Sequence, residues 1–339
     1  MRIDDFDYFL PAERIAQHPV EPRHDSRLLV LNRQNQERTH TSFWEIQEFL
    51  QPGDVLVINE TRVIPARLFA RKTTGGRAEV LLIRRETETV WEALVGGKKI
   101  RSGSRLTVEE GPGLTVEAVL EGARRLVRFD EPIEPFMTRI GQMPLPPYIH
   151  EKLSDPERYQ TVFARLPGSA AAPTAGLHFT PELMTVLEKQ GVRFARITLH
   201  VGLDTFAPVT ESDPREHVIH SEWCELGAES AELINTARNS GKRIVAVGTT
   251  SVRTLESAAL HAEEGQAVGM FSGSTRLFIL PGYTFRAVDA MITNFHLPRS
   301  TLLMLVSAFA GREEILATYA EAIEQHYRFY SFGDAMLIV

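Results

Sequence analysis

The sequence predicts an α/β fold: a mixed-sheet α/β domain that carries an inserted small antiparallel β-barrel domain. Strand-like and helix-like segments alternate through the first sixty residues and again from about residue 150 onward. Between them, residues 63–130 hold six short strand-like runs separated by glycine turns. A length of 339 residues, at roughly 150 residues per domain, also suggests two domains. We therefore expect a discontinuous α/β domain of residues 1–62 and 150–339 and a β-barrel domain of residues 63–149.

The first part of the α/β domain is predicted from two apolar runs and a helix-start signal. Residues 26–32 (SRLLVLN) and 54–58 (DVLVI) have the pattern of buried strands. Between them, Ser42 and Glu45 have the spacing of a capping box, which predicts a short helix that ends before Pro52.

The inserted domain is predicted from its six runs, ARLFARK, RAEVLLIRR, TVWEALV, SRLTVEE, LTVEAVL and RLVRF. Glycine turns at 74–76, 96–97 and 111–113 separate them, and no helix of useful length fits. Short strands at such regular spacing indicate a small closed barrel. The proline-rich segment 143–149 (MPLPPYI) predicts an extended return from it.

The second part of the α/β domain again alternates helix and strand. Thr180, Pro181 and Glu182 match an N-cap, a first-position proline and a first-turn acid, which predicts a helix up to Gly191. Strands are expected at 192–201, 244–247, 287–293 and 336–339, and further helices from residues 154, 228, 249, 300 and 312.

Composition limits the possible classes of protein. Cys224 is the only cysteine, so no internal disulfide and no cysteine-based zinc spacing is possible. The first residues are acidic rather than basic, and the longest apolar run, 302–310, is too short to cross a bilayer. We expect a cytoplasmic protein without a membrane segment.

The charge is unevenly distributed. The chain has a net charge of −7, but residues 62–105 contain eleven Lys and Arg against four acids. This excess could form a phosphate-binding face for RNA, or the cations could simply blunt exposed strand edges. The candidate RNA-binding residues are Arg62, Arg67, Lys98, Lys99 and Arg101.

Four polar loops are candidates for the functional site: residues 176–180, 200–205, 248–253 and 294–300. The last three follow predicted strands, and carboxyl ends of parallel strands share one edge of a sheet. If the loops converge there, their histidines could perform acid–base chemistry. The glycine turn at 248, the start of the helix after it and Arg253 in its first turn could together bind an anion. The candidate substrate-binding residues are Gly176, Thr180, His200, Gly202, Gly248, Thr250, Ser251, Arg253 and Asn294, and the candidate catalytic residues are His178, His296 and Thr249.

Structural roles are open for each of these residues. A lone histidine is more often buried with satisfied hydrogen bonds, and Arg253 could pair with an acid such as Glu256. His178 and His200, with the HxxH pair of His217 and His220, could instead bind a metal in a hydrolase, although no HExxH pattern is present.

Long motifs occur from one end of the chain to the other: FDYFLP (6–11), DSRLLVL (25–31), NETRV (59–63), MPLPPYI (143–149), RYQTVFA (158–164), AAPTAGLHFT (171–180), HVGLDTF (200–206), VGTTSVRTLES (247–257), TNFHLPRSTLLMLVSAF (293–309) and FGDAML (332–337). In these motifs the chain resembles, over essentially its whole length, the S-adenosylmethionine:tRNA ribosyltransferase-isomerases of queuosine biosynthesis. Three positions depart from the usual pattern: Asp204, Arg299 and Cys224.

The resemblance implies a reaction and its partners. The ribosyl group of S-adenosylmethionine would be transferred to, and isomerised on, 7-aminomethyl-7-deazaguanine at the wobble position of tRNAs with a GUN anticodon. The products would be epoxyqueuosine-tRNA, adenine and methionine. S-adenosylmethionine would be consumed as a substrate, and no cofactor, no metal and no membrane would be required; a monomer is expected.

The chemistry of this reaction suggests roles for the candidate residues. A base must remove a proton from the ribose C5′ beside the sulfonium, with His178 as first choice and His296 as second. The turn 248–253 would seat the methionine carboxylate, and Thr249, Ser251 or Asn294 would donate hydrogen bonds to departing adenine. A third class, an RNA-binding protein without catalysis, would bind tRNA and release no adenine.

Overall fold

The computed structural model describes residues 1–120, 122–151, 153–202, 209–219 and 221–339. The chain divides into two compact units. The α/β unit contains residues 1–61, 147–166 and 172–339, and the barrel unit contains residues 62–146 and 167–171. Both architectures agree with the predicted fold class, which is confirmed.

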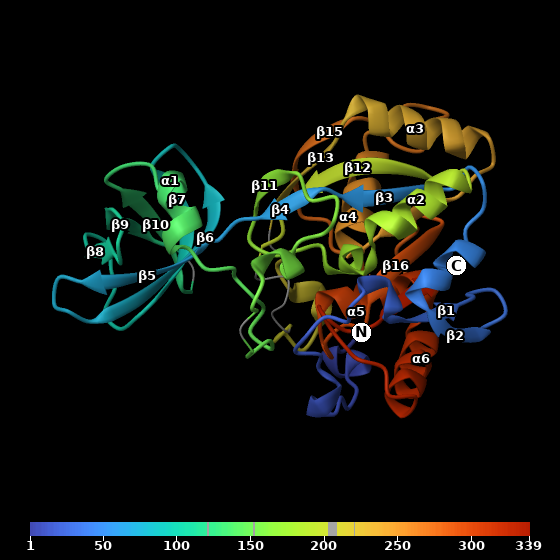
Figure 1. The fold of residues 1–339 in the computed structure, drawn as a ribbon, viewed down its shortest axis with the longest axis horizontal. Coiled ribbons are helices and arrows are strands. Elements are labelled where there is room, and N and C mark those ends of the chain that lie inside the picture. The colour runs from blue at the N-terminus through green and yellow to red at the C-terminus, as the bar shows by residue number, and fades with distance from the viewer. Residues whose placement is uncertain (121, 152, 203–208, 220) are drawn as a thin grey trace. The chain divides into compact units, whose positions relative to one another are not determined.

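Over the described residues, the α/β unit is built on one nine-stranded mixed sheet in the order β15-β13-β12-β3-β14-β16-β17-β1-β2 (Figure 1). The central strands β12, β3, β14 and β16 are mutually parallel, and β17 is antiparallel to β16. The strand bounds are β1 Arg27–Leu31, β2 Arg38–Ser42, β3 Val55–Asn59, β12 Arg193–Leu199, β13 Glu222–Leu226, β14 Ile244–Val247, β15 Phe271–Thr275, β16 Ala290–Asn294 and β17 Ala335–Ile338.

Helices cover both faces of this sheet. Alternate residues of β3 and β14 point in opposite directions, so Leu56 and Val247 join one core cluster while their neighbours face the other side. The helix bounds are α2 Pro181–Lys189, α3 Ala228–Asn239, α4 Thr249–Ala259, α5 Thr301–Ala310 and α6 Arg312–Glu324, with short 3₁₀ turns that include η3 Arg23–Asp25, η4 Phe43–Glu48, η5 Pro156–Tyr159 and η6 Thr174–His178.

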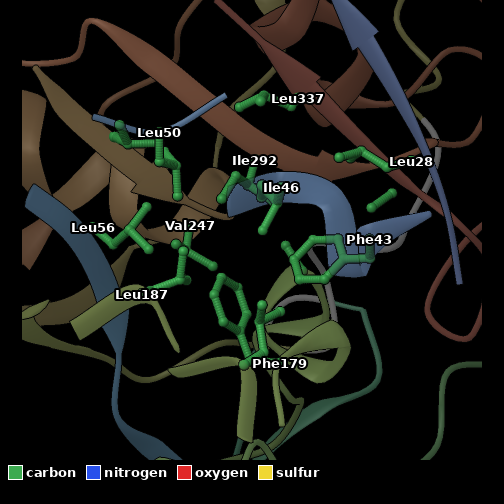
Figure 2. Packing of buried hydrophobic residues seen from close by; sticks show 14 of the residues in the cluster. Leu28, Phe43, Ile46, Leu50, Leu56, Phe179, Leu187, Val247, Ile292 and Leu337 are labelled. Atoms are coloured by element: carbon green, nitrogen blue, oxygen red, sulfur yellow. The ribbon is translucent and has the colours of Figure 1, made fainter. Parts of the chain in front are cut away.

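One face of the sheet carries the apolar cluster drawn in Figure 2. Phe43 and Ile46 of η4 and Phe179 and Leu187 of the η6–α2 segment pack onto β3, β14, β16 and β17. Phe43 meets Phe179 edge to face with ring centroids 5.0 Å apart. This packing fixes the segment 172–180 against the sheet, directly beside the loops at its carboxyl edge.

Two local predictions differ from the structure. The expected capping box is not formed, because the Ser42 side chain caps no amide and the helix is the 3₁₀ turn η4. The helix expected from residue 154 is the single turn η5, capped by Asp155. In contrast, Thr180 caps α2 as predicted, accepting a hydrogen bond from the Leu183 amide at 3.3 Å.

The barrel unit is a closed antiparallel barrel in the order β10-β7-β6-β5-β8-β9. Alternating apolar residues fill its interior, as Val80, Leu106 and Val127 show by being completely buried. The bounds are β5 Arg67–Lys72, β6 Arg77–Arg85, β7 Val90–Gly96, β8 Arg105–Val108, β9 Gly113–Val119 and β10 Arg124–Phe129, followed by helix α1 Glu134–Ile140; β4 Thr61–Val63 and β11 Leu166–Ser169 form a two-stranded ribbon.

Candidate active site

A cavity lined by apolar residues and several hydroxyl and amide groups opens at the carboxyl ends of β14 and β16, entirely within the α/β unit. Its volume is ≈ 50 Å³, and part of it is open to solvent. Four segments supply most of its lining: residues 172–175 before and within η6, the turn 248–250, residues 293–297 at the end of β16, and Tyr330 with Ser331 ahead of β17. The lining is completed by Tyr148, Val201, Ser300 and Leu302. The parallel order of the central strands brings the turn after β14 and the end of β16 to this one edge.

Gly248 makes the turn from β14 into α4 possible. Its φ is +86°, which glycine adopts freely and other residues do not, and its amide donates to the Ile292 carbonyl at 2.8 Å. The first turn of α4 therefore presents its amino end to the cavity at Thr249 and Thr250. Among the described residues, the buried Thr250 Oγ1 has no hydrogen-bond partner. This hydroxyl and the helix amino end together form a site for an anionic or polar ligand group.

Asn294 joins three parts of the cavity wall. Its Oδ1 accepts a hydrogen bond from Thr174 Oγ1 at 3.2 Å, and its Nδ2 donates to the Tyr330 carbonyl at 3.2 Å and to His178 Nε2 at 3.1 Å. Asn294 is buried, so each of these bonds is protected from water. The residue therefore fixes the relative positions of η6, β16 and the loop before β17.

His178 lies behind the cavity rather than on it. Because Asn294 donates to its Nε2, the ring proton is on Nδ1, which donates to Ser26 Oγ at 2.7 Å. The ring lines a smaller neighbouring cavity with Arg23 and Ser26. Burial, with smaller contributions from Arg328 and Arg23, lowers the pKa of His178 to about 3. The first-choice base is thus neutral, but both of its nitrogens are already hydrogen-bonded.

His296 lines the cavity itself. Its Nε2 lies 2.8 Å from Thr293 Oγ1, whose hydroxyl donates to the Asn294 carbonyl at 3.3 Å, so Nε2–H is the donor to Thr293. Its backbone is held by Tyr319 and Tyr8. In the part of the chain that the structure describes, Nδ1 has no partner, and burial lowers the pKa of His296 to about 3. The ring is therefore neutral, and its Nδ1 is an acceptor that no described protein group uses.

Arg253 is not on this cavity. Its guanidinium pairs with the buried Glu222, and its Nε donates to the Leu277 carbonyl at 3.1 Å. It lines a second cavity that shares Leu302 with the first. The predicted anion-binding site therefore consists of the amino end of α4 alone, without Arg253. The partner is Glu222 rather than Glu256, which accepts hydrogen bonds from the amides of residues 286–288.

The other sequence candidates in the α/β unit contact neighbouring protein groups instead of the main cavity. His200 stacks on Trp223 with ring centroids 5.3 Å apart and bonds Thr61 at 3.1 Å, while burial lowers its pKa. The Gly202 amide donates a hydrogen bond to Glu222 at 2.9 Å, and Ser251 Oγ donates to the Val247 carbonyl at 2.8 Å.

Gly176 and Thr180 also have structural roles. Gly176 is required for close packing, because a Cβ there would lie 2.7 Å from the Phe163 ring. Thr180 caps α2, and its Oγ1 lies 2.7 Å from His24 Nδ1.

The histidines of the metal hypothesis have separate hydrogen-bond partners. His217 Nδ1 lies 2.9 Å from Glu211, whereas His178 contacts Ser26 and Asn294. Within the described residues, no group of three or more His, Cys, Asp or Glu side chains has a metal-binding arrangement. His220 and Asp204 lie outside the described residues.

Sequence reasoning missed two aromatic residues of the cavity wall, Tyr148 and Tyr330. Their rings contact each other with centroids 4.7 Å apart, and both line the cavity. Tyr148 lies in the proline-rich segment 143–149, whose composition predicts only an extended return from the barrel. The sequence signal for Tyr330 is its position in the turn between Arg328 and Gly333, just before the last predicted strand.

The candidate RNA-binding residues of the barrel unit fall into two groups. Lys98, Lys99 and Arg101, in the loop between β7 and β8, are exposed and make no ion pair among the described residues; we call them the barrel-loop cluster. Arg67, in contrast, pairs with Glu79 at 3.2 Å, and Arg62 also has an interaction partner. Arg105 and Arg128 pair likewise with Asp130 and Glu117. Much of the positive charge of this segment is therefore neutralised locally.

The two buried histidines make stability depend on pH. Their pKa is about 3 in the folded protein, whereas an unfolded histidine has a pKa of about 6.5. Between these values the unfolded chain binds more protons, so the unfolding free energy is greatest above about pH 6.5 and falls as the pH falls. The expected slope is about 1.4 kcal/mol per pH unit for each histidine.

Urea unfolding of the wild type and of His178→Gln at pH 6.5 and 5.5 checks this expectation. The variant lacks one titrating group, so it should lose about 1 kcal/mol less than the wild type over that interval, because the unfolded-state histidine is already half protonated at pH 6.5. Equal losses in the two proteins would contradict a neutral buried His178.

The nine-stranded sheet, the cavity at its carboxyl edge and the barrel define the class of protein as an α/β protein with an inserted β-barrel. The chain belongs to the queuosine biosynthesis protein family, whose model matches residues 3–338. It is similar to the S-adenosylmethionine:tRNA ribosyltransferase-isomerases of Symbiobacterium thermophilum (56% identical) and Carboxydothermus hydrogenoformans (53% identical), with 100% of each chain covered. The predicted family membership is thereby confirmed.

A solved structure is similar as well. The S-adenosylmethionine tRNA ribosyltransferase of Thermotoga maritima is 42% identical, and the match covers 99% of this chain and 100% of that one with a TM-score of 0.58. Over the described residues, no helix is both long and apolar enough to cross a membrane.

Proposed function

We propose that this enzyme transfers and isomerises the ribosyl moiety of S-adenosylmethionine onto 7-aminomethyl-7-deazaguanine at the wobble position of tRNA. The products are epoxyqueuosine-tRNA, adenine and methionine, and the tRNA has a GUN anticodon. S-adenosylmethionine is a substrate, and the protein acts as a cytoplasmic monomer without a cofactor. The names of full-length relatives at 50–56% identity support the reaction class.

The observation that carries the proposal is the composition of the cavity. The cavity is lined by the neutral imidazole of His296, by the amino end of α4 with the unpaired hydroxyl of Thr250, and by the aromatic pair Tyr148 and Tyr330. A sulfonium nucleoside requires a base for C5′, an anion seat for its carboxylate, and donors for the departing adenine.

His296 is the proposed base, in preference to His178. Its free Nδ1 is at the cavity, whereas the Nε2 of His178 accepts a hydrogen bond from Asn294. Removing a proton from the carbon beside the sulfonium leaves a net-neutral ylide and a cationic imidazolium. Positive charge therefore moves from substrate to His296 within the cavity, and no new charge pair is created there.

The amino end of α4 is the proposed seat of the methionine carboxylate. Thr250 contributes its unpaired hydroxyl there, and Gly248 keeps the backbone accessible. The Thr249 hydroxyl is the proposed donor to departing adenine, because Ser251 Oγ and both hydrogens of Asn294 Nδ2 are already used. The absence of charged lining residues among those described favours an incoming amine in its neutral form.

The barrel-loop cluster is the proposed contact to tRNA phosphates. A wobble base in an anticodon loop can be splayed into a pocket without opening a duplex, while cations hold the surrounding backbone. Lys98, Lys99 and Arg101 suit this task because no neighbouring carboxylate competes for them among the described residues.

Replacing the cluster with glutamines (Lys98→Gln, Lys99→Gln, Arg101→Gln) should weaken tRNA binding and reduce the slope of log K against log salt by about 2 to 3. The matched control neutralises Arg105 and Arg128, whose charges are already balanced by Asp130 and Glu117. Filter binding across a salt series measures both. An unchanged slope in the cluster variant would contradict the assignment.

The function itself is tested by following adenine and methionine by chromatography. We expect release of both only when tRNA carries the aminomethyl-deazaguanine precursor. Release without tRNA, abolished by a chelator, would favour the metal-dependent hydrolase instead. Tight tRNA binding without release would favour a non-catalytic RNA-binding protein.

A further inference from the structure

The main cavity has no charged side chain among the described residues that line it. Its polar groups are hydroxyls, an amide and the neutral His296, whereas the guanidinium of Arg253 lines the second cavity and is paired with Glu222. A permanently cationic substrate bound there would therefore find no lining carboxylate as counter-charge. Something else in the wall must offset the loss of water around the cation.

Tyr148 and Tyr330 are the part of the wall suited to this task. Their ring centroids lie 4.7 Å apart at an interplanar angle of 52°, so the two faces form an open angle rather than a closed stack. Burial raises the pKa of both phenols, so both rings are uncharged. The face of a neutral aromatic ring carries partial negative charge and attracts cations.

The two rings are held in place by surrounding hydrogen bonds. Tyr148 Oη lies 2.7 Å from Ser331 Oγ. Tyr330 has φ of +70°, a conformation that is uncommon for an aromatic residue. Its amide donates to the Phe295 carbonyl at 3.2 Å, and its carbonyl accepts from Asn294 Nδ2 at 3.2 Å. This backbone conformation is maintained at the cavity wall, as is frequent at functional sites.

We propose that Tyr148 and Tyr330 form the binding site for the sulfonium cation of the substrate, through contacts between the cation and the ring faces. The inference rests on the proposed function and adds the chemical group that this part of the wall recognises. When the C5′–S bond breaks, sulfur keeps the electron pair and methionine becomes a neutral thioether. The contact is then lost, so the aromatic pair discriminates substrate from product.

The test compares binding of S-adenosylmethionine with binding of S-adenosylhomocysteine, which has the same adenosine and amino acid but a neutral thioether. Calorimetry on the full-length protein measures both affinities without turnover. We expect the wild type to prefer the sulfonium by about tenfold or more, as cation–π energies in a desolvated site predict. Tyr148→Leu and Tyr330→Leu should each reduce that preference several-fold by weakening S-adenosylmethionine binding alone.

Tyr148→Phe and Tyr330→Phe are the matched controls, since they keep the ring face and should keep the preference. Leucine and phenylalanine both have a Cβ, so the backbone at residue 330 is equally strained in both variants. Site-specific fluorinated phenylalanines at 148 and 330 provide a second series that keeps the shape of the ring, and sulfonium affinity should fall with each added fluorine.

Leucine variants or a fluorinated series with the full wild-type preference would overturn the inference while leaving the proposed function intact. A wild type that binds both ligands equally would do the same. A wild type that binds neither ligand, with or without tRNA, would instead contradict the proposed substrate.

Discussion

Replacing His296 with glutamine lowers the single-turnover rate of ribosyl transfer by about 10²–10⁴-fold, the usual contribution of a positioned general base. Glutamine keeps a hydrogen-bonding group beside Thr293 but has no basic nitrogen to accept the C5′ proton. The affinity for S-adenosylmethionine should change little, because the ring accepts the proton only during the reaction. Rapid-quench measurement of adenine formation at saturating substrate gives the rate, and calorimetry gives the affinity.

His178→Gln is the comparison that separates the two histidines. His178 touches Asn294 rather than the cavity, so it acts as a positioning residue and its loss should cost much less in rate. The reverse pattern, with transfer abolished in His178→Gln and unchanged in His296→Gln, would show that His178 is the base, as the sequence first suggested.

Replacing Arg253 with methionine lowers the free energy of unfolding by about 3–5 kcal/mol, the usual cost of leaving a buried charge without its partner. The side chains of Arg253 and Glu222 are 7% and 4% exposed, so the Glu222 carboxylate cannot recover its lost partner from water. Glu222 also accepts the Gly202 amide, and this links the ion pair to the segment after β12. Urea denaturation measures the loss.

The double variant Arg253→Met, Glu222→Gln should recover most of that stability. Glutamine removes the buried negative charge that has lost Arg253 and keeps an oxygen for the Gly202 amide. A loss below about 1 kcal/mol in the single variant, combined with a large increase in KM for S-adenosylmethionine, would return Arg253 to the substrate-binding role that its sequence position suggested.

The fold could be predicted because its signals are local. Apolar runs at β1, β3 and β14, the Thr180 cap and the glycine turns of the barrel each identify an element without knowledge of its neighbours. The sequence does not predict the edge strand β15 or its neighbour β13, because their residues are only partly apolar. Ser42 shows the opposite error, since a capping-box spacing occurs without the capping bond.

The arrangement of the site was less predictable because it depends on contacts between distant residues. The sequence identified His178, His296 and Asn294, but the direction of the His178 ring depends on Ser26, 152 residues away. In the same way, Arg253 pairs with a glutamate 31 residues earlier on another element. The backbone at Tyr330 has no sequence signature, since a positive φ there is imposed by Phe295 and Asn294.

The most direct test of the account uses S-adenosylmethionine with two deuterium atoms at C5′ and tRNA carrying the precursor base. After reaction with the wild type, mass spectrometry of the digested nucleosides should show epoxyqueuosine with a single deuterium, since the base removes one hydrogen from that carbon. Unmodified precursor, or a product that retains both deuterium atoms, would contradict proton removal beside the sulfonium and with it the proposed use of this cavity.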